Sequence, residues 1–148
     1  MPAPADIAIR LIDPVDQEAL ARCHAVAVEL RPQFAEVEEF VHAAIMAQGR
    51  GVNFAFVEHE GEVRSFTGFR IGQNLSWGTH MYVDDLVTRA QDHGSGYGSA
   101  LFDWLVAEAR RRGCAQFHLD SGVQRFDAHR FYLHKGMNIS AHHFAMPL

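Results

Sequence analysis

The residues of this sequence best suited to chemistry form a glycine-rich loop, His93-Gly94-Ser95-Gly96-Tyr97-Gly98-Ser99. Its three glycines occupy alternate positions between an apolar run typical of a strand and an amphipathic run typical of a helix. Glycine lets the backbone approach a ligand closely, and the N–H groups and dipole of a helix N-terminus favour an anion. The loop therefore predicts a phosphate-containing ligand, and a flexible connection without a ligand is the alternative.

Two common phosphate-binding loops fit this segment poorly. A P-loop requires lysine after its last glycine, whereas Gly98 is followed by Ser99. A dinucleotide-binding loop is closer, because Gly94 and Gly96 follow one strand and Asp120 ends the next. Its third glycine is replaced by Ser99, however, and the chain ends at residue 148, only 28 residues after position 120. Neither of these two loop types is therefore the preferred interpretation.

The elements that must position the loop are read from hydrophobic periodicity and turn residues. Strands are expected over Ile7–Ile12, Asn53–Glu58, Val63–Ile71, Thr79–Thr88, Ala115–Asp120 and Met137–Phe144. Helices are expected from an Asp13-Pro14 N-cap through Leu30, over Val37–Ile45, over Gly96–Arg112 up to Gly113, and over Asp127–Lys135. His59–Glu62 predicts a hairpin, and Gly72–Gly78 a loop. The order β-α-α-β-β-β-α-β-α-β predicts one mixed α/β (α+β) domain over residues 1–148.

Composition limits the class of protein. The chain has 148 residues, of which 48% are hydrophobic and 21% charged, as in an ordinary globular domain. Its formal net charge is -5, and the only cluster of basic residues is Arg110–Arg112, late in an expected helix. Nucleic acid is therefore not an expected partner, because binding to its backbone relies on concentrated positive charge.

Cysteine usage and the apolar runs indicate the compartment. Cys23 and Cys114 are far apart, so neither a disulfide framework nor a cluster of thiolate ligands is expected, and a reducing cytosol fits. The N-terminal residues lack the pattern of a signal peptide, and no apolar run reaches the roughly 18 residues that a membrane span needs. We therefore expect a cytoplasmic protein without a membrane partner.

The segment from Tyr82 to Leu101 resembles the main acetyl-CoA motif of GNAT acetyltransferases, whose loop reads Arg/Gln-x-x-Gly-x-Gly/Ala. The resemblance continues through Arg112-Gly113-Cys114, Leu119-Asp120-Ser121 and Phe131-Tyr132-x-x-x-Gly136-Met137. It thus covers residues 80–137 with specific motifs, and the first 80 residues in element order only. It implies a GNAT-like fold with a mostly antiparallel central sheet, acetyl-CoA as cosubstrate, and N-acetyl transfer.

The same resemblance implies roles in holding acetyl-CoA. The backbone of Leu86, Val87 and Thr88 would meet the pantetheine arm and the thioester carbonyl, and the loop from His93 to Ser99 would hold the pyrophosphate. His93 stands where relatives usually have Arg or Gln. Ser121 is placed near the pantetheine. Arg125 stands where many relatives have asparagine, so it either pairs with a CoA phosphate or is simply exposed to solvent.

Acetyl transfer also needs a base for the amine and an acid for the departing thiolate. By resemblance Tyr132 is the acid, with a core aromatic beside Phe131 as the alternative. Asp84 is preferred over Asp85 as the base, with a structural ion pair as the alternative. Neighbouring strand residues face opposite sides unless a bulge intervenes. An aspartate with its ordinary pKa of about 3.9 is a weak base, so a raised pKa, a relaying water or an orienting role is required.

The acetyl acceptor is not encoded by any motif. We expect a primary amine of a small molecule or a protein. Four acidic residues of the first two helices hint weakly at a cationic acceptor: Glu29, Glu36, Glu38 and Glu39. No metal is expected, and the last strand would mediate a homodimer if the chain assembles as relatives often do. A non-catalytic CoA-binding sensor is the alternative function, and a nucleotide oxidoreductase, which predicts NAD binding, is a third.

Overall fold

The computed structural model describes all 148 residues and divides into two compact units, Met1–His118 and Leu119–Leu148. The elements in chain order are β1 (Ala8–Leu11), α1 (Gln17–Leu30), α2 (Val37–Gln48), β2 (Val52–His59), β3 (Glu62–Asn74), β4 (Gly78–Thr88), the short 3₁₀ helix η1 (Ala90–Asp92), α3 (Tyr97–Arg111), β5 (Gln116–Leu119) and α4 (Phe126–His134). The strands form one sheet in the order β1-β2-β3-β4-β5. This arrangement confirms the predicted mixed α/β class.

The expected C-terminal strand over Met137–Phe144 is wrong, because residues 137–148 form no strand. A strand exists only where another strand accepts and donates its backbone hydrogen bonds. This segment has no place in the order of the sheet, and Ile139 and Phe144 are 75% and 92% exposed. Its partly alternating apolar residues fit a strand pattern, but a local pattern cannot supply a pairing partner.

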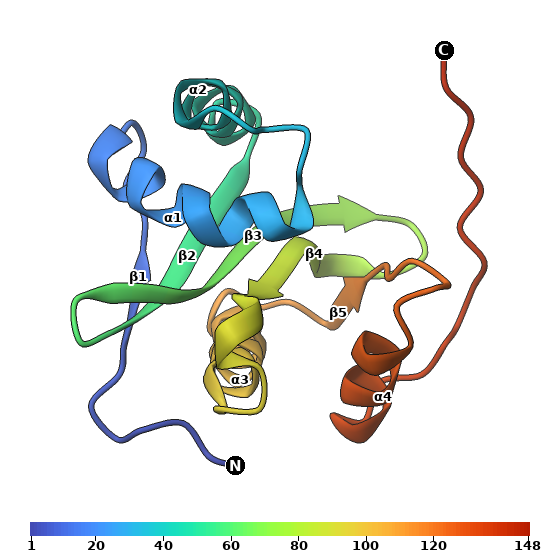
Figure 1. Cartoon of the computed structure of the whole chain (residues 1–148). Helices are drawn as coiled ribbons and strands as arrows, with labels where there is room; N and C mark the ends of the chain where they lie inside the picture. Colours follow the sequence, from blue (N-terminus) through green and yellow to red (C-terminus); the bar gives the residue numbers. More distant parts are fainter. The chain divides into compact units, whose positions relative to one another are not determined.

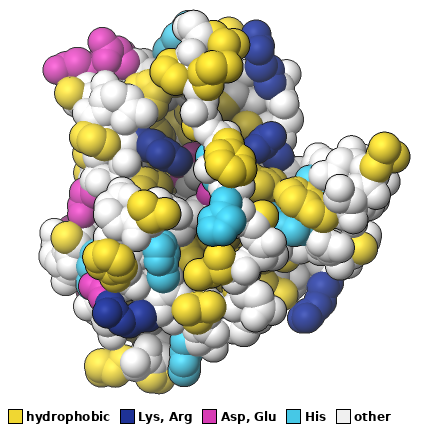
Figure 2. All heavy atoms as spheres, turned by 90° about the vertical axis from the view of Figure 1, so that its right-hand side faces the viewer, with side chains coloured by type: hydrophobic (Ala, Val, Ile, Leu, Met, Phe, Trp, Pro, Cys, Tyr) yellow, Lys and Arg dark blue, Asp and Glu magenta, His cyan; other side chains and the backbone are white.

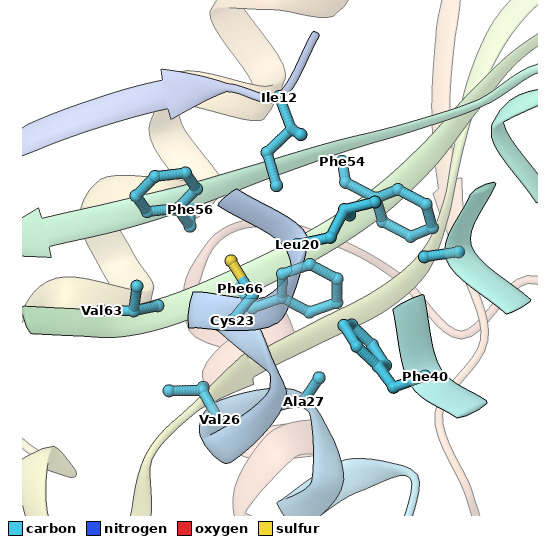
Figure 3. Packing of buried hydrophobic residues seen from close by; sticks show 11 residues of the cluster. Ile12, Leu20, Cys23, Val26, Ala27, Phe40, Phe54, Phe56, Val63 and Phe66 are labelled. Carbon is cyan, nitrogen blue, oxygen red and sulfur yellow. The ribbon is translucent and has the colours of Figure 1, made fainter. Parts of the chain in front are cut away.

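Helices α1 and α2 cover one face of the sheet, and α3 covers the other (Figure 1). On the first face, Leu20 and Cys23 of α1 pack with Phe40 of α2 and with Phe54 and Phe66 of the sheet, as Figure 3 shows from close by. This core contains stacked and edge-to-face aromatic rings, which add to the stabilisation that burial provides.

The face covered by α3 has a core of its own. Leu101 and Tyr97 of α3 pack against Val57 of β2. Further along the helix, the rings of Trp104 and Phe69 meet edge to face at 6.1 Å. The start of α3, which carries the glycine loop, is therefore fixed against the sheet by buried side chains.

The two hairpins differ in how well the sequence predicts them. Between β2 and β3, Glu60 and Gly61 have φ angles of 53° and 75°, as in a two-residue type I′ turn, which confirms the expected hairpin. The predicted loop Gly72–Gly78 is much shorter, because β3 continues to Asn74 and β4 begins at Gly78. The Asn74 side chain accepts a hydrogen bond from Trp77 N at 2.7 Å and closes this tight turn.

Of two helix ends predicted from the sequence, the start of α1 was wrong and the end of α3 is confirmed. The N-cap of α1 is Asp16 and not Asp13, because Val15 has a left-handed φ of 62° that no helix tolerates. The Asp16 side chain accepts from Ala19 N at 3.1 Å, as an N-cap should. At the end of α3, Gly113 has a φ of 78° and stops the helix as predicted.

One face of the molecule, in Figure 2, shows several separate Lys and Arg side chains and no continuous basic patch. None of the helices combines the length and apolar character that crossing a membrane requires.

Candidate functional site

Strand β4 contains a β-bulge at its pair of aspartates. In the pairing with β3, Gly68 lies opposite Asp85 and the next residue, Phe69, lies opposite Val83. Asp84 is therefore the extra residue, without a partner on β3. The sequence alone did not decide whether a bulge occurs at these aspartates, and the structure contains one.

The bulge turns both carboxylates toward the same side of the sheet. Val83 lies opposite Phe69, whose ring meets Trp104 of α3, so Val83 faces α3. Leu86 packs against the α3 core as well. The two aspartates between them both face the side covered by α1 and α2, whereas a regular strand would separate them.

Asp84 is bound in a structural ion pair. Its two carboxylate oxygens accept from Nε and Nη2 of Arg70, each at 2.8 Å. The same guanidinium lies 5.2 Å from the centre of the Tyr82 ring. A bidentate pair of this kind fixes the orientation of the carboxylate.

Asp85 has different surroundings. Its Oδ1 accepts from Nε of Arg31 at 2.6 Å, and Nη2 of Arg31 also binds the backbone oxygen of Asp84 at 3.0 Å. Burial raises the pKa of the Asp85 carboxyl, and the charge of Arg31 opposes this rise. A raised pKa makes a carboxylate a better base. These contacts favour Asp85 over Asp84 as the candidate base, the reverse of the preference drawn from the resemblance.

A pocket of about 230 Å³ adjoins Asp85 between the two N-terminal helices and the sheet. Its wall includes Arg31 and Gln33 next to α1, and Val87 of β4. The rest is apolar, and its aromatic part consists of Phe34, Phe40, Phe54 and Phe66. Sequence analysis missed Arg31 and these rings as site residues, because their convergence depends on the fold.

The glycine loop is shaped for close backbone approach. Gly94 and Gly96 have φ angles of 85° and 86°, which glycine adopts without strain. Gly96 is the N-cap of α3 and provides no side-chain cap, so the first N–H groups of the helix have no partner from that residue. At Gly98 an added Cβ would lie 2.8 Å from Oγ1 of Thr88, so only glycine lets α3 start this close to β4.

The N-terminal tripeptide lies against this loop. A Cβ added to Gly96 would be 2.4 Å from Ala3 N and 2.6 Å from both Met1 O and Pro2 C. The backbone of residues 1–3 therefore contacts the N-cap glycine directly. A ligand that used this side of Gly96 would have to displace the tripeptide.

The two larger side chains of the loop, His93 and Tyr97, make hydrogen bonds within the protein. Nε2 of His93 donates to the carbonyl oxygen of Thr88 at 2.9 Å, so the ring points back to the end of β4. Tyr97 is buried, and its hydroxyl is 2.8 Å from Nδ1 of His59. The loop therefore offers a ligand mainly its backbone and the two half-buried serines, Ser95 and Ser99.

Sequence analysis also missed Asp92, which holds the segment before the loop. Its buried carboxylate binds Arg89 and lies 3.4 Å from Nη1 of Arg64. Nearby, Glu29 of α1 accepts from Ala90 N at 2.8 Å. In the sequence, only the i,i+3 spacing of Arg89 and Asp92 indicates that these two residues could form an ion pair. These contacts fix the connection from β4 to α3, and they give Glu29 a structural role in place of the suggested attraction for a cationic acceptor.

The second unit carries the remaining predicted site residues. Tyr132 of α4 meets Phe131 edge to face at 5.5 Å. Burial raises the pKa of the Tyr132 phenol, and Arg125, the N-cap of α4, opposes this rise. The phenol therefore keeps its proton at neutral pH, as an acid must. The Oγ of Ser121 is buried without a hydrogen-bond partner, a state that a ligand or a water normally relieves.

The described residues hold no group of three His, Cys, Asp or Glu side chains arranged for a metal ion. Two histidines near the C-terminus have partners within the second unit. His143 Nδ1 lies 2.5 Å from Oδ2 of Asp120, and His129 Nε2 lies 2.7 Å from the carbonyl oxygen of Gly122.

Comparison with known proteins identifies the class. Residues 17–137 match the acetyltransferase (GNAT) family. The chain is 32% identical over 135 residues to the uncharacterised N-acetyltransferase YhdJ of Bacillus subtilis, a match that covers 89% of this chain and 94% of the relative. It is 36% identical over 66 residues to an aminoalkylphosphonate N-acetyltransferase of Salmonella typhimurium, covering 45% of this chain and 43% of that protein.

Among solved structures, the aminoglycoside N-acetyltransferase AAC(6')-Iy in complex with CoA superposes with a TM-score of 0.79 at 12% identity. The superposition covers 100% of this chain and 98% of that one, which confirms the fold. Fold, loop and sequence match define the class as acyl-CoA-dependent N-acetyltransferases. This chain belongs to the GNAT acetyltransferase family.

Proposed function

We propose that this protein transfers the acetyl group of acetyl-CoA to a primary amine by direct attack, with Asp85 as the base. The observation that carries the proposal is the β4 bulge. It turns a largely buried carboxylate into a pocket, immediately before the strand segment expected to meet the thioester.

The glycine loop supports acetyl-CoA as the cosubstrate. Two left-handed glycines and an uncapped first helical turn suit the two negative charges of a pyrophosphate. Strand β5 has four residues and β4 has eleven, so β5 can lie alongside only part of β4. Where β4 has no partner on this edge, its backbone groups are free for the amide groups of the pantetheine arm, and the family resemblance assigns this role to Leu86–Thr88.

Each step of the proposed reaction is assigned to one group, to Asp85 and the β4 backbone from their contacts and to Tyr132 from the family resemblance. Asp85 takes a proton from the substrate ammonium, directly or through a water, and the nitrogen lone pair attacks the thioester carbonyl carbon. The carbonyl oxygen becomes an oxyanion, which backbone N–H groups stabilise because they are oriented before the charge develops. Collapse breaks the carbon–sulfur bond, and Tyr132 gives its proton to the leaving CoA thiolate. Asp84 takes no part beyond holding the bulge through Arg70.

Replacing each aspartate by asparagine tests the assignment of the base. Asp85→Asn should lower kcat/KM by about 10²–10⁴-fold, the usual contribution of a positioned base, with unchanged acetyl-CoA affinity. Asp84→Asn is the matched control and should cost much less. The measurement is CoA thiol release in the presence of a panel of primary amines. Equal losses in the two variants would contradict the distinction between them.

Tyr132→Phe tests the acid. We expect slower thiol release at saturating amine, by about tenfold or more, because the thiolate must leave without its proton donor. Unchanged release would remove Tyr132 from the mechanism and leave the rest of the proposal intact.

Two further expectations remain proposals. A cytoplasmic location is checked by fractionating cells that express the chain. The homodimer is checked by sedimentation of the purified protein, and a monomer at all concentrations would exclude it.

A further inference from the structure

The pocket beside Asp85 has a wall that limits which amines fit it. Ten of its thirteen lining residues are apolar. Phe34, Phe40, Phe54 and Phe66 supply aromatic surface, and alanines of α1 and α2 leave space between the rings. Burial of apolar surface is favourable at roughly 25 cal/mol per Å², so this wall favours a ligand that has an apolar body.

Only one carboxylate, that of Asp85, lines the pocket. The acidic residues of α1 and α2 that suggested a polycation do not contribute to this wall. Glu29 is bound to Ala90 N, and Glu38 and Glu39 are exposed. An acceptor with several ammonium groups would find a partner for only one of them in this wall, and any other that faced the apolar surface would lose hydration. The charge pattern therefore matches a monoamine.

The volume of about 230 Å³ sets the size. An apolar cavity of about 150 Å³ accepts benzene, so this pocket has room for one aromatic ring or a branched aliphatic group with a short linker. Such a linker places the nitrogen at the carboxylate when the apolar body lies among the phenylalanine rings.

Arg31 occupies the position that the ammonium needs. Its Nε is 2.6 Å from Oδ1 of Asp85, but its side chain is 45% exposed and it follows the last residue of α1. The guanidinium can turn toward water, and the incoming ammonium replaces the positive charge that Asp85 would otherwise lose, so the carboxylate is not left without a partner. The substrate ammonium can thus replace the guanidinium as the partner of Asp85.

We infer that the acetyl acceptor is a small primary monoamine with one aromatic or branched aliphatic body, whose ammonium displaces Arg31 from Asp85. This inference rests on the proposed acetyl transfer and adds the substrate class to it. The discriminating feature is the apolar wall, and not the number of positive charges on the acceptor.

The test compares kcat/KM for five amines by CoA release: phenethylamine, isoamylamine, ethylamine, spermidine and 2-aminoethylphosphonate. We expect phenethylamine and isoamylamine to exceed the other three by at least about tenfold, which corresponds to about 1.4 kcal/mol of differential binding. A polyamine or phosphonate preferred over phenethylamine would overturn the inference and leave acetyl transfer standing. Turnover with none of the five would count against the proposed function itself.

A variant of the pocket wall tests whether the preference for apolar amines arises in this pocket. Ala43→Leu adds bulk to the wall and should lower the ratio of kcat/KM for phenethylamine to that for ethylamine by about tenfold. Ala25→Leu, at an exposed position of α1 outside the wall, is the control and should keep the wild-type ratio. Circular dichroism confirms that both variants fold. An unchanged ratio in a folded Ala43→Leu protein would show that the amine binds elsewhere.

Discussion

At the scale of single residues, Asp84 and Asp85 have the same side chain and adjacent positions but different surroundings. The first is fixed by two hydrogen bonds from Arg70. The second lines an apolar pocket, and its partner Arg31 comes from the end of α1 and not from the neighbouring strand. This difference cannot be read from the sequence, because Arg31 lies 54 residues away and the bulge is set by strand pairing. Environment, and not residue type, selects the base.

Arg31→Met should move the acidic limb of the pH–rate profile upward. Arg31 lowers the pKa of Asp85 against the larger effect of burial, so its removal leaves the pKa raised further. A general base is active when deprotonated, and activity is therefore lost at a higher pH in the variant. The measurement is kcat/KM for one amine between pH 4 and 8. Arg10→Met, far along the chain and paired with Glu58, is the control; an acidic limb that stays in place in Arg31→Met would contradict the role of this ion pair.

Cys23 should resist thiol reagents in the folded protein. Burial raises its pKa to about 12, and the thiolate is the reactive form. At pH 8 iodoacetamide should therefore modify the half-buried Cys114 first, and Cys23 only after denaturant is added. Mass spectrometry of peptides gives the two rates. Equal rates without denaturant would mean that the α1 core opens readily.

At the scale of elements, the approach of α3 to β4 is the decisive contact. Gly98 meets Oγ1 of Thr88, which also shares a hydrogen bond of 2.6 Å with Ser65 Oγ. The sequence indicated that glycines let a backbone approach a ligand. In the structure, Gly98 lets one element approach another, and the loop acquires its shape as a result.

Gly98→Ala should lower both stability and acetyl-CoA affinity. The added Cβ overlaps Oγ1 of Thr88, and overpacking of this kind typically costs about 1–3 kcal/mol. Adding Thr88→Ala removes the overlapping atom and should recover part of the loss. Gly49→Ala, at a helical φ with a nearest contact of 3.4 Å, is the control. Thermal unfolding and acetyl-CoA titration give both quantities, and a neutral Gly98→Ala would show that α3 shifts freely.

The N-terminal tripeptide offers a second test of the loop. Deleting residues 2–5 removes the backbone that contacts Gly96 and keeps Asp6, which binds His59. If the pyrophosphate uses this side of the glycine, affinity for acetyl-CoA should rise by about two- to tenfold, because no contact has to be displaced. Calorimetric titration measures the change. A loss of affinity would mean that the tripeptide supports the ligand instead of competing with it.

At the scale of the whole molecule, features that depend on residues close together in the sequence were predicted, and features that depend on distant residues were not. Elements fixed by local periodicity were foreseen to within a few residues, from α2 to the C-terminal stop of α3 at Gly113. The prediction of a strand over Met137–Phe144 was wrong, because a strand needs a pairing partner elsewhere in the sequence. The position of the glycine loop between β4 and α3 was predicted from its residues, and its role in binding acetyl-CoA stays a prediction. The bulge, the Arg31 ion pair and the aromatic wall were not, because each joins segments that only the fold brings together.

We propose that the molecule is an enzyme and not only a CoA-binding module. The most direct test mixes the purified protein with acetyl-CoA and phenethylamine and follows both products, free CoA by thiol assay and the N-acetylated amine by mass spectrometry. We predict equal amounts of the two products from the wild type and almost none from Asp85→Asn at the same acetyl-CoA affinity. Tight acetyl-CoA binding without any acetylated amine, across the whole amine panel, would contradict the account and favour the non-catalytic module.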